Sequence, residues 1–179
     1  LVPVLKSFWL SVHVSIITAS YGFLALGCAL GCFTLILFAC KPSSAIFMAI
    51  GRLTLINEVA LILGLTLLVI GNFLGAIWAN ESWGRYWGWD PKETWAYISI
   101  LVYTMILHLR LIPKWYSKYL FAVVSLLGFS SILMTYFGVN FYLAGMHSYA
   151  TGDPVPIPTW VYVVSFVVLG LIIVSSNNR

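Results

Sequence analysis

Charged side chains are scarce in this chain of 179 residues, in which nine Lys and Arg and five Asp and Glu together make up 8%. A typical soluble domain has about 25%. Hydrophobic residues account for 61% of the chain, and the mean hydropathy is +0.99. So few charges cannot cover a water-soluble globule of this size. The composition therefore predicts an integral membrane protein whose main surroundings are the lipid bilayer.

Two further absences exclude other classes of protein. The three cysteines, Cys28, Cys32 and Cys40, form neither a CxxC pair nor a zinc-type spacing. The net charge of +4 is small, and the basic residues form no stripe. A nucleic-acid partner is therefore not expected.

Long apolar runs predict an all-α fold with about five or six transmembrane helices in a single domain over residues 1–179. The runs do not alternate with a period of two, as the strands of a membrane β-barrel would. A bilayer core needs about 20 apolar residues per helix. The expected spans are residues 8–39, 55–78, 94–111, 119–139 and 158–175. A tryptophan-rich loop over about 79–93 and a second loop over about 140–157 are expected on one side.

The basic residues of the short loops predict the orientation. One side has six and the other has three: Lys41, Arg52, Arg110, Lys114, Lys118 and Arg179 against Lys6, Arg85 and Lys92. The first set is therefore expected inside, which places the N-terminus and the Trp-rich loop outside and the C-terminus inside. The run Asp90-Pro-Lys-Glu93 reads as an N-cap, a proline at the first helical position and an acid at the third.

The Trp-rich segment, residues 78–95, contains five of the eight tryptophans: Trp78, Trp83, Trp87, Trp89 and Trp95. An aromatic belt at the membrane interface explains one or two at each helix end. It does not explain Trp87-Gly-Trp89 between the ends. The segment instead indicates an aromatic surface for a large planar ligand, with Arg85 and Lys92 available for its acidic groups.

The three histidines fall on both sides of the membrane in this layout. A lone histidine near an interface is usually structural, but His13 and His147 share the side of the Trp-rich segment. Two neutral imidazoles can fill both axial positions of a haem iron. His108 lies roughly 25 Å along the third span from Pro91, near the inner end. It is either a helix-end histidine or part of a second site, in which Glu58 could orient its ring.

The string WGRYWGWDPKETWA, residues 83–96, resembles the WWD signature of haem-handling proteins in cytochrome c biogenesis, and most closely the CcsA (ResC) family of System II. The resemblance covers nearly the whole chain. It implies that haem b is bound by the two outer histidines, His13 and His147, with both acting in catalysis. It also implies further cofactor-binding residues: Trp78, Asn80, Trp83, Arg85, Tyr86, Trp87, Trp89, Asp90 and Trp95.

The family resemblance further implies haem export and a holocytochrome c synthetase activity, in which thioether bonds form between haem and the CxxCH segment of apocytochrome c. His108 would ligate a second haem with a histidine of a CcsB (ResB)-like membrane half, fused or separate, which is absent from this sequence. The expected location is a bacterial inner or thylakoid-type membrane. The alternatives are a System I haem transporter or chaperone without ligation activity, and a membrane subunit of a respiratory complex.

Overall fold

The computed structural model describes residues 7–147 and 156–178. Lys6, Arg179 and residues 148–155 of the second expected outer loop lie outside this range. The described chain is all-α, with no strand in these two ranges. Its helices are α1 (Phe8–Ala39), α2 (Ser44–Trp83), α3 (Pro91–His108), α4 (Lys118–Leu133), α5 (Val139–Tyr142) and α6 (Thr159–Ser175), with short 3-10 turns at Leu109–Leu111 and Ser176–Asn178.

Within the described ranges, four helical segments are long and apolar enough to cross a membrane: Phe8–Ala39, Ser44–Trp83, Pro91–Leu111 and Lys118–Tyr142. The apolar helix α6 is shorter, with 17 residues. The fold is therefore that of an all-α integral membrane protein, as the composition predicts. Four of the five expected spans lie on these segments, and the fifth, 158–175, lies on α6, which is shorter than a full span.

Helix α2 is much longer than the span of 55–78 that its hydropathy suggests. The side chain of Ser43 caps its start by accepting a hydrogen bond from the Ile46 N–H, and Gly84 ends it in the left-handed conformation with φ 72°. Its 40 residues extend for about 60 Å, roughly twice the thickness of a bilayer core. The helix therefore extends beyond its apolar run at both ends and stops only at the capping residues Ser43 and Gly84.

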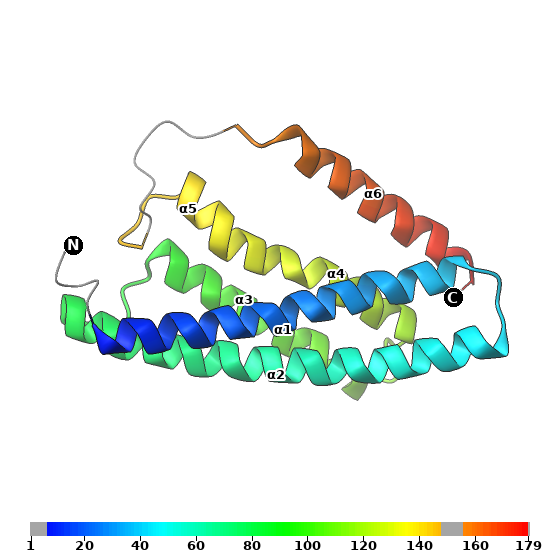
Figure 1. Ribbon diagram of the computed structural model, residues 1–179, viewed down its shortest axis with the longest axis horizontal. Coiled ribbons are helices and arrows are strands. Elements are labelled where there is room, and N and C mark those ends of the chain that lie inside the picture. The colour runs from blue at the N-terminus through cyan, green and yellow to red at the C-terminus, as the bar shows by residue number, and fades with distance from the viewer. Residues whose placement is uncertain (1–6, 148–155, 179) are drawn as a thin grey trace.

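Helices α1 and α2 lie side by side along most of their length, with α3 and α4 packed against them (Figure 1). Small residues allow the close approach: a Cβ on Gly64 would lie 2.5 Å from Leu24 Cδ2, and a Cβ on Gly31 would lie 2.8 Å from the Ala122 carbonyl. The main buried cluster joins all four helices and contains Leu24, Leu61, Leu68, Tyr103, Ile106, Phe121 and Ile132. Helix α6 contacts α1, and Tyr119 of α4 donates a hydrogen bond to its Ile172 carbonyl.

The start of α3 and the end of α4 position the residues discussed below. Asp90 and Glu93 form the expected capping box, in which each side chain accepts a backbone hydrogen bond from the other end of the turn. At the same end of the bundle, α4 continues as a π-helical stretch over Met134–Gly138 and then as α5. Such π-helical turns are frequent at functional sites.

Candidate functional site

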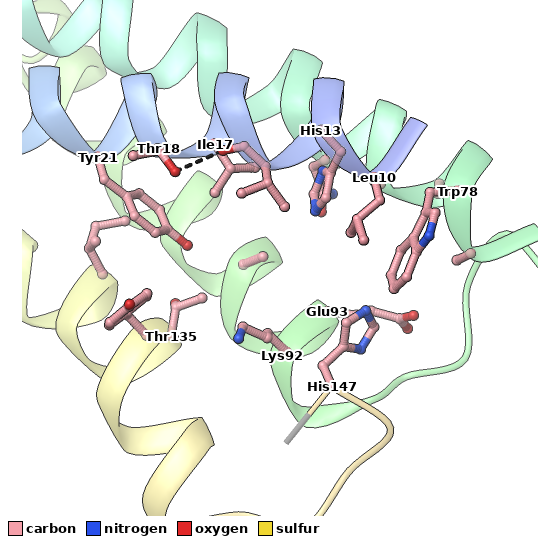
Figure 2. Close-up of a pocket in the computed structure, with 18 of the residues that line it drawn as sticks. Leu10, His13, Ile17, Thr18, Tyr21, Trp78, Lys92, Glu93, Thr135 and His147 are labelled. Atoms are coloured by element: carbon pink, nitrogen blue, oxygen red, sulfur yellow. Dashed lines mark hydrogen bonds between the residues drawn. The ribbon is translucent and has the colours of Figure 1, made fainter. Parts of the chain in front are cut away.

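A cavity of about 740 Å³ lies at the end of the bundle where α1 begins and α2 ends. This volume falls within the roughly 300–1,000 Å³ typical of small-molecule and cofactor sites. Its walls come from α1, α2, α3, α4, the π-helical stretch and the loop after α5. They are mainly apolar and aromatic, with Leu10, Ile17, Tyr21, Tyr86, Trp87, Ile132, Tyr136 and Phe137 among the lining residues. Figure 2 shows His13 of α1 and His147 of the loop on opposite sides of this space.

His13 is oriented by the neighbouring helix α2. Its Nδ1 lies 2.7 Å from the carbonyl oxygen of Gly71. Because a carbonyl can only accept, Nδ1 carries the proton and Nε2 keeps its lone pair. A Cβ on Gly75 would lie 2.6 Å from Cε1 of the same ring, so this glycine makes the space in which the imidazole lies.

His147 lies in the loop that follows α5 and is oriented by Asp90. Its Nδ1 is 2.9 Å from Asp90 Oδ2, and the preceding Met146 N–H donates to Asp90 Oδ1 at 2.6 Å. Burial raises the pKa of the Asp90 carboxyl. The hydrogen bonds from Met146, His147 and Lys92 outweigh this effect, and the pKa is below its usual value. The ionised carboxylate makes Nδ1 of His147 the donor, so in the neutral imidazole Nε2 is the acceptor nitrogen.

Tryptophans surround the two imidazoles. The Trp78 ring is 2% exposed, and its centroid lies 6.4 Å from that of His13 and 5.7 Å from that of His147. Trp83 contacts His147 edge-on, with centroids 4.9 Å apart. Neither Nε2 has a hydrogen-bond partner among the described residues. The site therefore presents two oriented nitrogen lone pairs in an aromatic setting.

Not every residue singled out in the Trp-rich segment lines the cavity. Tyr86 and Trp87 do, whereas the side chain of Trp89 is 70% exposed and meets only the edge of Trp87 among the described rings. The backbone of Trp89 has φ 57°, which is unusual for a residue with a large side chain. Asn80 and Trp95 are half-buried outside the cavity lining.

The two cations of this segment have different positions. Lys92 lines the cavity and donates to the side-chain oxygen of Asn140 at 3.0 Å. Arg85 is exposed and directs its Nη2 to Met146 Sδ at 3.1 Å, away from the cavity lining. Lys92 is therefore the basic group that can meet an acidic ligand in the cavity.

His108 lies at the far end of α3 from Asp90. It is exposed, and its Nδ1 donates to the Thr104 carbonyl at 2.7 Å within the same helix. The hypothesis that Glu58 orients this ring is wrong, because Glu58 forms an ion pair with Arg110 instead. The nearest orienting group is thus a backbone carbonyl of its own helix.

Sequence reasoning missed several residues that shape the site. Gly71 and Gly75 orient and accommodate His13, and Thr135 and Tyr136 enter the cavity from the π-helical stretch. The second role of Asp90, as the hydrogen-bond partner of His147, was not expected either. The helix-capping pattern gave no sign of it, because the two residues are 57 positions apart.

Comparison with known proteins gives a consistent result. The family described as "Cytochrome C assembly protein" matches residues 1–147. "Protein NrfI" of Wolinella succinogenes is 69% identical over 158 residues, which cover 87% of this chain and 18% of that protein.

Two proteins named "Cytochrome c biogenesis protein CcsA" are also similar. The one from Chlamydomonas reinhardtii is 41% identical over 151 residues, covering 83% of this chain and 42% of that protein. The one from Prochlorococcus marinus strain MIT 9301 is 36% identical over 174 residues, covering 83% and 56%. The chain thus spans between 18% and 56% of the length of these three relatives.

Proposed function

This chain belongs to the cytochrome c assembly protein family and has a role in cytochrome c biogenesis, and from that premise we propose that its cavity holds haem b and presents it to apocytochrome c. His13 and His147 supply the two axial nitrogens. The observation that carries the proposal is that both imidazoles have the same hydrogen-bonding pattern. Each Nδ1 donates to an oxygen, and each Nε2 is left for a metal. Metal-ligating histidines are typically oriented in this way.

The rest of the cavity suits the same substrate. Aromatic side chains and apolar residues of α1 and α4 supply surface for a flat macrocycle. Lys92 supplies a cation for a carboxylate of that macrocycle. In this assignment Trp78 and Trp87 contact the substrate, Trp83 supports His147, and Trp89 faces outward.

The reaction that we assign to the assembled protein is thioether formation. Each thiol of a CxxCH segment adds across a haem vinyl group: its sulfur bonds to one vinyl carbon and its proton goes to the other, with no net oxidation. The histidine of the segment takes one axial position. The chain's own residues bind, orient and exclude water, and the rate gain comes from positioning thiol against vinyl. No described side chain is assigned as a general base.

His108 is proposed to serve haem entry at the opposite end of the bundle, paired with a histidine of a CcsB-like half. Its exposure and the unpartnered Nε2 among the described residues support this role. The distribution of basic residues supports an orientation with His108 inside and the cavity outside.

The experiment uses the complete protein containing this chain, purified with haem. Replacing His13 or His147 by Ala should abolish the low-spin absorption bands of six-coordinate haem. In a second assay the protein is incubated with apocytochrome c and a reductant, and a haem-stained band on a denaturing gel reports thioether formation. Unchanged bands in both variants would exclude ligation by these residues. If haem binds but no covalent product forms, the protein is a haem carrier and the synthetase activity is excluded.

A further inference from the structure

The two imidazoles are held in very different ways. His13 lies inside α1, with helical residues on both sides, and its hydrogen-bond partner is a backbone carbonyl of α2. Gly75 lies directly against its ring. The imidazole is therefore held against α2 on one side, while its other side faces the cavity.

His147 has no helix to hold it. The α5 helix ends at Tyr142, and the chain continues in non-helical conformation to His147. Two hydrogen bonds at this end of the loop, from the Met146 N–H and from His147 Nδ1, both end on the single carboxylate of Asp90, and Arg85 adds a contact to Met146 Sδ. A Cβ on Gly145 would lie 2.5 Å from Asp90 Oδ1, so the backbone itself packs against that carboxylate.

Asp90 follows a residue with unfavourable backbone geometry. Trp89, directly before it, has φ 57° and a 70% exposed side chain. Left-handed backbone in a bulky residue costs of the order of 1–3 kcal/mol and persists where the surroundings enforce it. In the same loop, Tyr86 lines the cavity and is 61% exposed. Asp90 itself is buried, at 7% exposed, but it directly follows the strained and exposed Trp89.

Resting on the proposed function, we propose that His147 is the axial ligand that the histidine of the incoming polypeptide replaces, that His13 stays bound, and that Asp90 is the positioning residue that governs the exchange. In this step the bond between iron and His147 Nε2 breaks, and the lone pair of the polypeptide imidazole forms the new bond. The oxidation state of the iron does not change, and no proton is consumed. Only the loop before His147 has to move.

The first test uses a ligand that can coordinate but cannot react. A CxxCH peptide with both cysteines replaced by serine is titrated into the complete haem-loaded protein carrying either His147→Gly or His13→Gly. The peptide should restore the low-spin bands of His147→Gly at a concentration at least about tenfold lower than in His13→Gly, a difference of about 1.4 kcal/mol. Equal affinity, or a preference for His13→Gly, would overturn the assignment.

Free imidazole is the control, because it is small enough to reach either vacated position. Restoration of the low-spin bands by imidazole in both variants shows that both have folded and retain haem. If the unsubstituted protein shows no six-coordinate haem at all, the proposed function itself fails. If imidazole binds in both variants but the peptide prefers the position vacated by His13, only the present inference fails.

The second test measures the exchange without removing either histidine. Carbon monoxide binds ferrous six-coordinate haem only after one histidine has left, so its binding rate at saturation reports that departure. Asp90→Asn should raise the rate by about tenfold, because the amide loses the charge that strengthens the bond to His147. Glu81→Gln, an exposed acid near the end of α2, should leave it unchanged. An unchanged rate in Asp90→Asn would contradict the role of Asp90.

Discussion

The histidines at the two ends of the helix bundle are oriented by different kinds of group. At the cavity end, His13 and His147 come from distant parts of the chain, and each is oriented by a group on another segment. At the other end, His108 is exposed and is oriented by Thr104 of its own helix. Glu58, the nearby acid that could have oriented it, is paired with Arg110.

This difference separates the end where two oriented imidazoles face one cavity from the end where the chain supplies a single histidine. Orienting an imidazole through its second nitrogen costs nothing at the moment of ligation, because the ring is already in place. The cavity end has two such rings around one space, whereas only one ring is available at the other end. The comparison fits a proposed haem site formed by this chain at one end and a shared site at the other.

The largest effect is expected from Asp90→Ala. Without Asp90, His147 would lose the group on another segment that orients it, as His108 lacks one at the other end. It removes both hydrogen bonds to the His147 loop and the N-cap of α3. The lost cap alone costs about 0.5–2 kcal/mol. Low-spin haem should be lost and the thermal unfolding temperature should fall. Absorption spectra and an unfolding scan measure the two effects, and full retention of low-spin haem would show that His147 needs no orienting partner.

A narrower change at the same end is Gly75→Ala. The added methyl group would lie 2.6 Å from Cε1 of His13, so the imidazole must shift and the low-spin bands should weaken. The matched control is Gly22→Ala in α1, where nothing lies within 4 Å of the added Cβ. That control should keep its spectrum and gain up to about 1 kcal/mol of helix stability. Equal spectra in both variants would mean that His13 does not bind the iron.

His108→Ala tests the other end. Haem already at the cavity should keep its low-spin spectrum, because the two ends of α3 are about 25 Å apart. Loading of that cavity in cells should fall instead, and haem content per mole of purified protein measures it. Loss of the cavity spectrum in protein reloaded with haem after purification would show that the two ends are coupled directly.

Much of the fold follows from the sequence for simple reasons. Apolar runs long enough to cross a bilayer must be helical, and the Asp90 to Glu93 pattern satisfies the first free N–H groups of α3. The ends of α2 could not be placed from hydropathy. Its polar residues resemble loop residues, whereas the end of the helix is decided locally by Ser43 and by the left-handed Gly84.

The site was only partly predictable for a different reason. The sequence indicates that His13, His147 and the tryptophans share one side, because helix lengths determine which ends meet. It does not indicate which tryptophan faces inward. Trp89 is exposed and has a left-handed backbone that its residue type does not predict, and the pairing of His147 with Asp90 is a contact between segments far apart in the chain.

The smallest effect is expected from Glu58→Gln, which removes one charge of the ion pair at the far end. The side chain of Arg110 is 58% exposed and that of Glu58 is 18% exposed, and a pair with one exposed partner near the surface contributes about 1 kcal/mol. The cavity spectrum should not change, and the unfolding temperature should move little. A rise in haem loading would be informative, because it would mean that Glu58 holds Arg110 where it hinders access to His108. A loss of haem from the cavity would instead show that the two ends of the bundle are coupled, and the contrast drawn between them would be wrong.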